Sequence, residues 1–278
     1  MHALALPSLS CAMLLHARVP PRSAPQLSAV EPLTLGSHVR YLSEVALLMP
    51  PQALGAVAAL LTSRGEELVE PGSDLAMHPL LVPLTRSPED GEVTGLLRWP
   101  GASGGGSKLP LVRTDGIGLR WLAPGAEEFL HRELVLADAE GNDEEAFVTA
   151  GSLAATCDIS YERGAAASSA GGTAGFVITK VAPFMQEYER LAASHMAKAS
   201  EQGQQAALIT CERNQACFAA WGRPFAFHAL RLLDLEREEE ARDLARQALR
   251  FEACACCPGP YTAPAAPSQT PNSCPPPS

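Results

Sequence analysis

The chain has 278 residues, of which 46% are hydrophobic, 19% are charged and only 5% are aromatic. This length accommodates one domain of ordinary size or two small ones, with an interior built mainly from Leu, Ala and Val. The formal net charge is −10 and no basic cluster offsets it. The composition therefore argues against binding to nucleic acid or to an anionic membrane surface, because both need positive charge. No run of about 18 apolar residues is present, so no membrane-spanning segment is predicted.

Residues 1–30 differ in composition from the rest of the chain. The first acid is Glu31, the only strong bases before it are Arg18 and Arg22, and Ser, Ala and Pro occur throughout. This pattern is typical of a plastid transit peptide, and it predicts localisation in the chloroplast. A mitochondrial presequence is the main alternative, followed by an unstructured cytosolic terminus or a poor signal peptide.

A pair of short helices is predicted next, at the start of a region that spans residues 35–122. The stretch "PQALGAVAALLTSRG" predicts the second helix, with Pro51 at its start and Gly65 as its stop. The stretch "SHVRYLSEVALLM" predicts the first, and residues 50–51 make the joint of an antiparallel pair. The apolar side of the first helix is expected to consist of Val39, Leu42, Val45 and Leu48.

Four strands are predicted in the remainder of this region. "PLLVPLTR" and "EVTGLLRW" flank the turn "SPEDG", and "LPLVRT" and "GIGLRWL" flank the hairpin dipeptide at residues 115–116. The pattern predicts a small antiparallel sheet. The glycine-rich stretch "GASGGGSK" is interpreted as a strand connector, because Lys108 does not directly follow the last Gly and a strand, not a helix, comes next.

Residues 124–253 are predicted to be a helical region. "GAEEFLHRELVLADAE", "DEEAFVTAGSLAAT" and "QQAALITCERNQACFAAW" are expected helices, and "FVITKVAPFMQEYERLAASHMAK" is an expected long helix, kinked or started at Pro183. "ERGAAASSAGGTAG" is expected to be a surface loop. The fold class is therefore α+β: a small antiparallel sheet, preceded by a short helix pair and followed by a helical half.

The helical half ends in a predicted hairpin. "RPFAFHALRLLDL" and "EREEEARDLARQALR" each have one apolar side, and a few polar residues join them, so the two helices fold back antiparallel. The acids at residues 238–240 and the later Arg246 and Arg250 complement the dipole of the second helix. Its apolar side consists of Ala241, Leu244, Ala245, Ala248 and Leu249.

This hairpin, residues 222–253, resembles a single degenerate unit of the tetratricopeptide-repeat family. His228, Ala245 and Ala253 depart from the family's pattern. Because a solenoid needs about three units, a superhelix is not predicted. The resemblance implies a surface for a protein partner, and with the transit-like start the chain looks like a nucleus-encoded plastid protein of the green lineage. The positions that match are Phe225, Ala229, Leu232, Ala241 and Ala248.

The predicted function is that of a non-enzymatic protein-interaction or assembly factor in an organelle, the plastid by preference. Trp221, Arg223 and His228 are the candidate partner-binding residues, because Trp and Arg are frequent binding anchors. Trp221 has an alternative interpretation as a cap on the helical core. No catalytic, cofactor-binding or metal-binding residue is proposed. The alternative function is a small enzyme or an enzyme accessory subunit, with a site between the sheet and the C-terminal helices.

The cysteines are interpreted as structural or incidental. Cys254, Cys256 and Cys257 lack the paired spacing of a zinc site. They precede a proline-rich tail, residues 258–278, which is predicted to be disordered. Cys211 and Cys217 are expected to be buried as small hydrophobic side chains.

Overall fold

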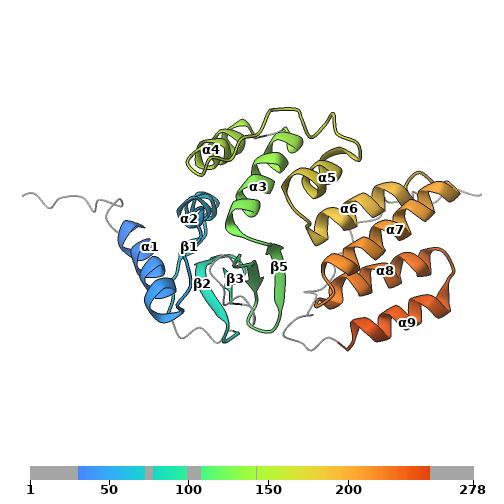
Figure 1. Cartoon of the computed structure of the whole chain (residues 1–278), viewed down its shortest axis with the longest axis horizontal. Helices are drawn as coiled ribbons and strands as arrows, with labels where there is room; N and C mark the ends of the chain where they lie inside the picture. Colours follow the sequence, from blue (N-terminus) through green and yellow to red (C-terminus); the bar gives the residue numbers. More distant parts are fainter. Residues whose placement is uncertain (1–30, 73–77, 99–107, 142, 251–278) are drawn as a thin grey trace, which may run out of the picture.

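The computed structural model describes residues 31–72, 78–98, 108–141 and 143–250 (Figure 1). These residues form helices and one five-stranded antiparallel sheet, with the helices concentrated after the sheet. The predicted α+β class with a helical C-terminal half is therefore confirmed. The predicted transit peptide, residues 1–30, and the predicted disordered tail, residues 258–278, lie outside the described residues.

Two helical segments precede the sheet, as the sequence predicts. Helix α1 (Glu31–Arg40) continues into a short π-helical turn, η2 (Tyr41–Val45), and α2 (Leu54–Ser63) follows the two prolines. Gly65 ends α2 in the left-handed region, with a φ of 88°. Gly is the residue that this conformation favours at a helix end.

The buried side of α1 and η2 differs from the predicted one. His38 and Leu42 are buried, whereas Val39 and Val45 are 43% and 63% exposed. His38 Nε2 lies 2.8 Å from the carbonyl oxygen of Pro83 in the sheet. This hydrogen bond turns the His38 side inward, so the prediction for Val39 and Val45 was wrong.

The sheet is a meander in which every neighbouring pair of strands is antiparallel. The four predicted strands are present. The sequence missed a fifth, which is only two residues long and too short to show any alternation. The strands are β1 (Glu67–Leu68), β2 (Leu81–Arg86), β3 (Val93–Leu97), β4 (Leu111–Thr114) and β5 (Leu119–Ala123).

The predicted turn residues shape both hairpins. Asp90 Oδ1 accepts a hydrogen bond from the Glu92 N–H at 3.0 Å. Asp115 Oδ1 accepts from the N–H groups of Ile117 and Gly118 at 2.9 and 3.0 Å. These are Asx-type turns, in which an Asp side chain bonds to the backbone two or three residues later.

The helical half follows in one continuous series. Ala182 is extended, with φ −170° and ψ 169°, and it divides the predicted long helix before Pro183. Within the described part of the chain, no helix is both long enough and apolar enough to cross a membrane. The elements are α3 (Ala126–Glu140), α4 (Glu144–Ala155), α5 (Gly172–Phe176), η3 (Val177–Val181), α6 (Met185–Met196), α7 (Glu201–Cys217), α8 (Gly222–Asp234) and α9 (Glu238–Ala248).

The connection between α4 and α5 is better ordered than the predicted surface loop. Asp138 on α3 accepts hydrogen bonds from the Tyr161 hydroxyl at 2.5 Å and from the Gly164 N–H at 2.8 Å. Ala166 is fully buried and α5 already begins at Gly172. The predicted surface loop is present, since residues 162–171 are mostly exposed turns, but its contacts to a distant helix are invisible in the local composition.

The sheet lies between two groups of helices (Figure 1). One apolar cluster joins the sheet to α2, α3 and α4, and a second joins its other face to α6 and to the connection between α7 and α8. Successive strand residues therefore enter opposite cores, as the alternation of a strand requires: Leu96 belongs to the first cluster and Leu97 to the second. The buried members of the second cluster are Leu81, Leu97, Val112, Leu119, Met185, Tyr188, Phe218 and Trp221.

Candidate functional site

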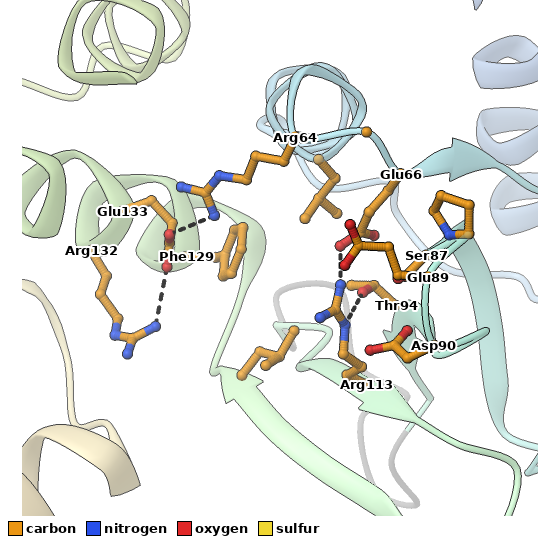
Figure 2. A pocket seen from close by; sticks show the side chains of 14 residues that line it. Arg64, Glu66, Ser87, Glu89, Asp90, Thr94, Arg113, Phe129, Arg132 and Glu133 are labelled. Carbon is orange, nitrogen blue, oxygen red and sulfur yellow. Dashed lines mark hydrogen bonds and ion pairs between the residues drawn. The ribbon is translucent and has the colours of Figure 1, made fainter. Parts of the chain in front are cut away.

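A charged pocket of about 460 Å³ lies between the end of α2, the β2–β3 turn and α3 (Figure 2). Its apolar lining includes Leu61, Leu122 and Phe129. Arginines and carboxylates from four different elements surround this apolar part. The charged residues are Arg64, Glu66, Glu89, Asp90, Arg113, Arg132 and Glu133.

The sheet side of the pocket is held by a buried carboxylate. Glu66 forms an ion pair with Arg113 and accepts a hydrogen bond from the Thr85 hydroxyl at 2.5 Å. Arg113 Nε donates to Thr94 Oγ1 at 3.0 Å. Arg113 is therefore held between Glu66 and Thr94, as Figure 2 shows.

The helical side is a second network that joins α2, α3 and α6. Glu187 is fully buried and accepts from Nε and Nη2 of Arg132 at 3.0 and 2.9 Å. Arg132 Nη1 donates to Glu133 at 3.1 Å, and Glu133 also pairs with Arg64 at 2.8 Å. The Arg132 guanidinium lies 5.2 Å from the centre of the Phe184 ring. Buried charges need such partners, because removing a charge from water is costly.

The pocket has the character of a structural charge network. Each of its arginines pairs with a carboxylate, and none of the described residues that line it is a histidine. Among residues 31–72, 78–98, 108–141 and 143–250, no three His, Cys, Asp or Glu side chains are grouped to hold a metal ion. The space between the sheet and the C-terminal helices, where the enzyme alternative places its site, contains packed apolar side chains.

Two of the predicted partner-binding residues pack against neighbouring elements. Trp221 is buried, with its ring centroid 5.4 Å from that of Trp121. Arg223 forms a bidentate pair with Glu189 on α6, at 2.8 and 2.7 Å, and keeps 29% of its side chain exposed. The alternative that Trp221 caps the helical core agrees with its burial.

His228, the third predicted residue, is buried between α7 and α9. Burial lowers its pKa below the usual value, while Glu212 opposes this shift. Its Nδ1 has no hydrogen-bond partner among the described residues, and neither has either side-chain amide atom of the buried Asn214. That these three residues contact a partner stays a prediction. Among them, Arg223 is the one whose side chain keeps substantial solvent-accessible surface.

The two cysteines of α7 have different environments. Cys211 is buried as predicted, and burial raises the pKa of its thiol to about 12. Cys217 is exposed, so the prediction of its burial was wrong. It is the last residue of α7, and its Sγ lies 3.6 Å from the Tyr188 hydroxyl.

An exposed apolar segment begins at Val45, the last residue of η2, and the sequence patterns did not indicate it. Val45, Leu47 and Met49 are 63%, 79% and 82% exposed. Met49 also lines a second pocket of about 260 Å³ with residues from the start of α3. A helical apolar pattern marks residues that tend to be buried, and here it assigned Val45 to the core.

Two family models match this chain in succession. The model described as PAB N-terminal matches residues 36–180, and the model described as PAB middle domain matches residues 185–256. The first covers the α1–η3 part of the fold and the second covers α6–α9. The sequence analysis placed a boundary near residue 123, between the sheet and the helices that follow it. That domain boundary stays a prediction.

A curated relative is similar to most of the chain. The chain is 34% identical over 216 residues to "Protein IN CHLOROPLAST ATPASE BIOGENESIS, chloroplastic" of Arabidopsis thaliana, an alignment that covers 77% of this chain and 63% of the relative. No solved structure matches the chain. The predicted chloroplast localisation is confirmed by this relative, whereas the tetratricopeptide resemblance is not confirmed. Because the PAB N-terminal model matches more than half of this chain, the chain belongs to the PAB family.

Proposed function

We propose that this chain is an assembly factor for the chloroplast ATPase and that it acts by binding a protein subunit. The supporting observation is its 34% identity over 216 residues to a relative that is named for chloroplast ATPase biogenesis. The charged pocket gives no support to the enzyme alternative, because each of its arginines already pairs with a carboxylate. A protein that only has to hold a subunit needs no reactive group.

The α8–α9 hairpin is the part of the helical half that we propose to present to the partner. Its resemblance to a tetratricopeptide unit supports this choice, and so does Arg223, which Glu189 holds in one orientation while part of it faces solvent. Such an ordered arginine loses little freedom on binding. Trp221 and His228 would act mainly by positioning α8.

The proposal is tested in Arabidopsis plants that lack the relative. Expression of this chain should raise the amount of assembled chloroplast ATPase, measured on native gels of thylakoid membranes. The matched control is the same chain with Glu189→Gln and Arg223→Gln together, which removes the oriented arginine and its partner. If this chain accumulates in the chloroplast and the ATPase level stays at that of the mutant, the proposed function is wrong.

A further inference from the structure

Three large apolar side chains point into solvent within one short segment, residues 45–49. Scattered exposed apolar residues are normal in proteins, but a group of them indicates an interaction surface. Val45, Leu47 and Met49 are all more than half exposed. We call these three residues the apolar segment.

The backbone at Leu47 makes this exposure harder to explain by folding alone. Leu47 has a φ of 54°, in the left-handed region that residues with a Cβ avoid. The Leu48 N–H donates to the Leu42 carbonyl at 2.8 Å and fixes this reversal at the end of η2. Gly or Asn would adopt this conformation at lower cost. Leu47 thus strains the backbone and gains almost no burial, so its side chain does not stabilise the part of the fold that the structure describes.

A small pocket adjoins the apolar segment. It has a volume of about 260 Å³, and Met49 and Pro50 form one wall. The buried Leu109 and Ala126 also line it, together with Glu127, and Lys108 at the pocket pairs with Glu128. This space accommodates an apolar side chain of a partner, which would bury Met49 as it enters.

The net charge of the family region that contains the apolar segment indicates the chemistry of the partner. Residues 36–180 contain 19 acids and 10 bases, a net charge of −9, whereas residues 185–256 contain 11 acids and 9 bases, a net charge of −2. The region that presents the apolar segment therefore carries most of the negative charge. Such a field attracts positively charged partners and raises their association rate.

We propose that the apolar segment and its pocket bind an amphipathic, positively charged segment of the partner protein. One side of that segment covers Val45, Leu47 and Met49, and its Lys and Arg residues are attracted by the net negative charge of residues 36–180. This inference rests on the proposed assembly function and adds to it a second docking place, apart from the α8–α9 hairpin, and the class of sequence that docks there. The site lies in the α1 part of the molecule, at the opposite end of the long axis from α9 (Figure 1).

The test uses the full chain and synthetic peptides. Overlapping 20-residue peptides that cover the water-soluble subunits of the Arabidopsis chloroplast ATPase are screened by fluorescence anisotropy. The peptides that bind should be amphipathic and positively charged. Replacing all their Lys and Arg residues by Gln should weaken binding several-fold, and so should raising the salt concentration from 50 to 200 mM.

The decisive variant is Leu47→Asn with Met49→Gln. Asn tolerates the left-handed conformation, so thermal stability should be equal or higher, while peptide affinity falls about tenfold or more. Val148→Gln on α4 and Ile117→Gln in the β4–β5 turn are matched controls, since each removes one exposed apolar side chain elsewhere. Both controls should bind the peptides like the unaltered chain.

Several outcomes would overturn the docking site. They are the absence of any binding peptide, equal binding by the double variant, an equal loss in the two controls, or no preference for positive charge. The complementation experiment separates this failure from failure of the function. A chain that restores ATPase assembly but fails these peptide tests keeps the proposed function and loses only this docking surface.

Discussion

Trp121 and Trp221 meet edge to face, with ring centroids 5.4 Å apart and ring planes at 72°. Trp121 lies on β5 in the region matched by the PAB N-terminal model, and Trp221 precedes α8 in the region matched by the PAB middle model. Phe218 adds a second edge contact to Trp121, at 5.6 Å. The two family regions therefore share one apolar core.

Replacing Trp221 by Ala should destabilise the whole chain. Deletion of a buried Trp side chain leaves a cavity and costs about 3–5 kcal/mol of unfolding free energy. Urea unfolding followed by circular dichroism measures this cost. Adding Trp121→Ala gives a double-mutant cycle, in which the ring–ring coupling should be about 0.5–1.5 kcal/mol. Two separate transitions in the unaltered chain would contradict the shared core.

Replacing Glu187 by Gln should be far more damaging than replacing a surface acid. Glu187 is the buried partner of Arg132, and removing one member of a buried pair costs about 3–5 kcal/mol because the other charge stays buried. Glu239, whose side chain is 83% exposed beside Arg242, is the matched control. Glu239→Gln should leave the thermal midpoint almost unchanged. Equal midpoints for the two variants would show that the Arg132 network contributes little.

Stability should depend on the protonation of His228. Because burial holds its pKa below 6.5, the folded state favours the neutral ring. The contribution is fully present above pH 6.5 and is lost as the pH falls through the lower folded-state pKa. His228→Leu should therefore lose less stability than the unaltered chain between pH 7 and pH 5.5, measured as urea midpoints. Glu212, Arg237 and Glu240 surround this ring and are unchanged in the comparison. Parallel pH profiles would contradict this role.

The two cysteines of α7 should react at different rates. The Cys211 thiol is buried, and its pKa is raised to about 12, so little thiolate forms near neutral pH. Cys217 is exposed. Brief treatment of the folded chain with iodoacetamide, followed by peptide mass spectrometry, should label Cys217 well before Cys211. In urea the two should react alike, and equal labelling of the folded chain would show that α7 opens readily.

The local structure followed from the sequence wherever neighbouring residues determine it. Asp90-Gly91 and Asp115-Gly116 form the two predicted turns, because the Asp side chain and the Gly conformation act within a few residues. The hairpin of α8 and α9 was predictable for a similar reason, since each helix shows its own apolar side. The chloroplast localisation was also predicted from composition, namely that of residues 1–30.

What the sequence could not determine depends on contacts between distant residues. His38 faces inward because of Pro83, 45 residues later, and the α4–α5 connection is ordered by Asp138 on α3. The pocket likewise combines Glu66, which directly precedes β1, with Arg113 on β4. An apolar pattern records which side of a helix favours burial, but only the tertiary structure decides whether another element covers it. For this reason Leu42 entered the core, while Val45 and Leu47 stayed in water.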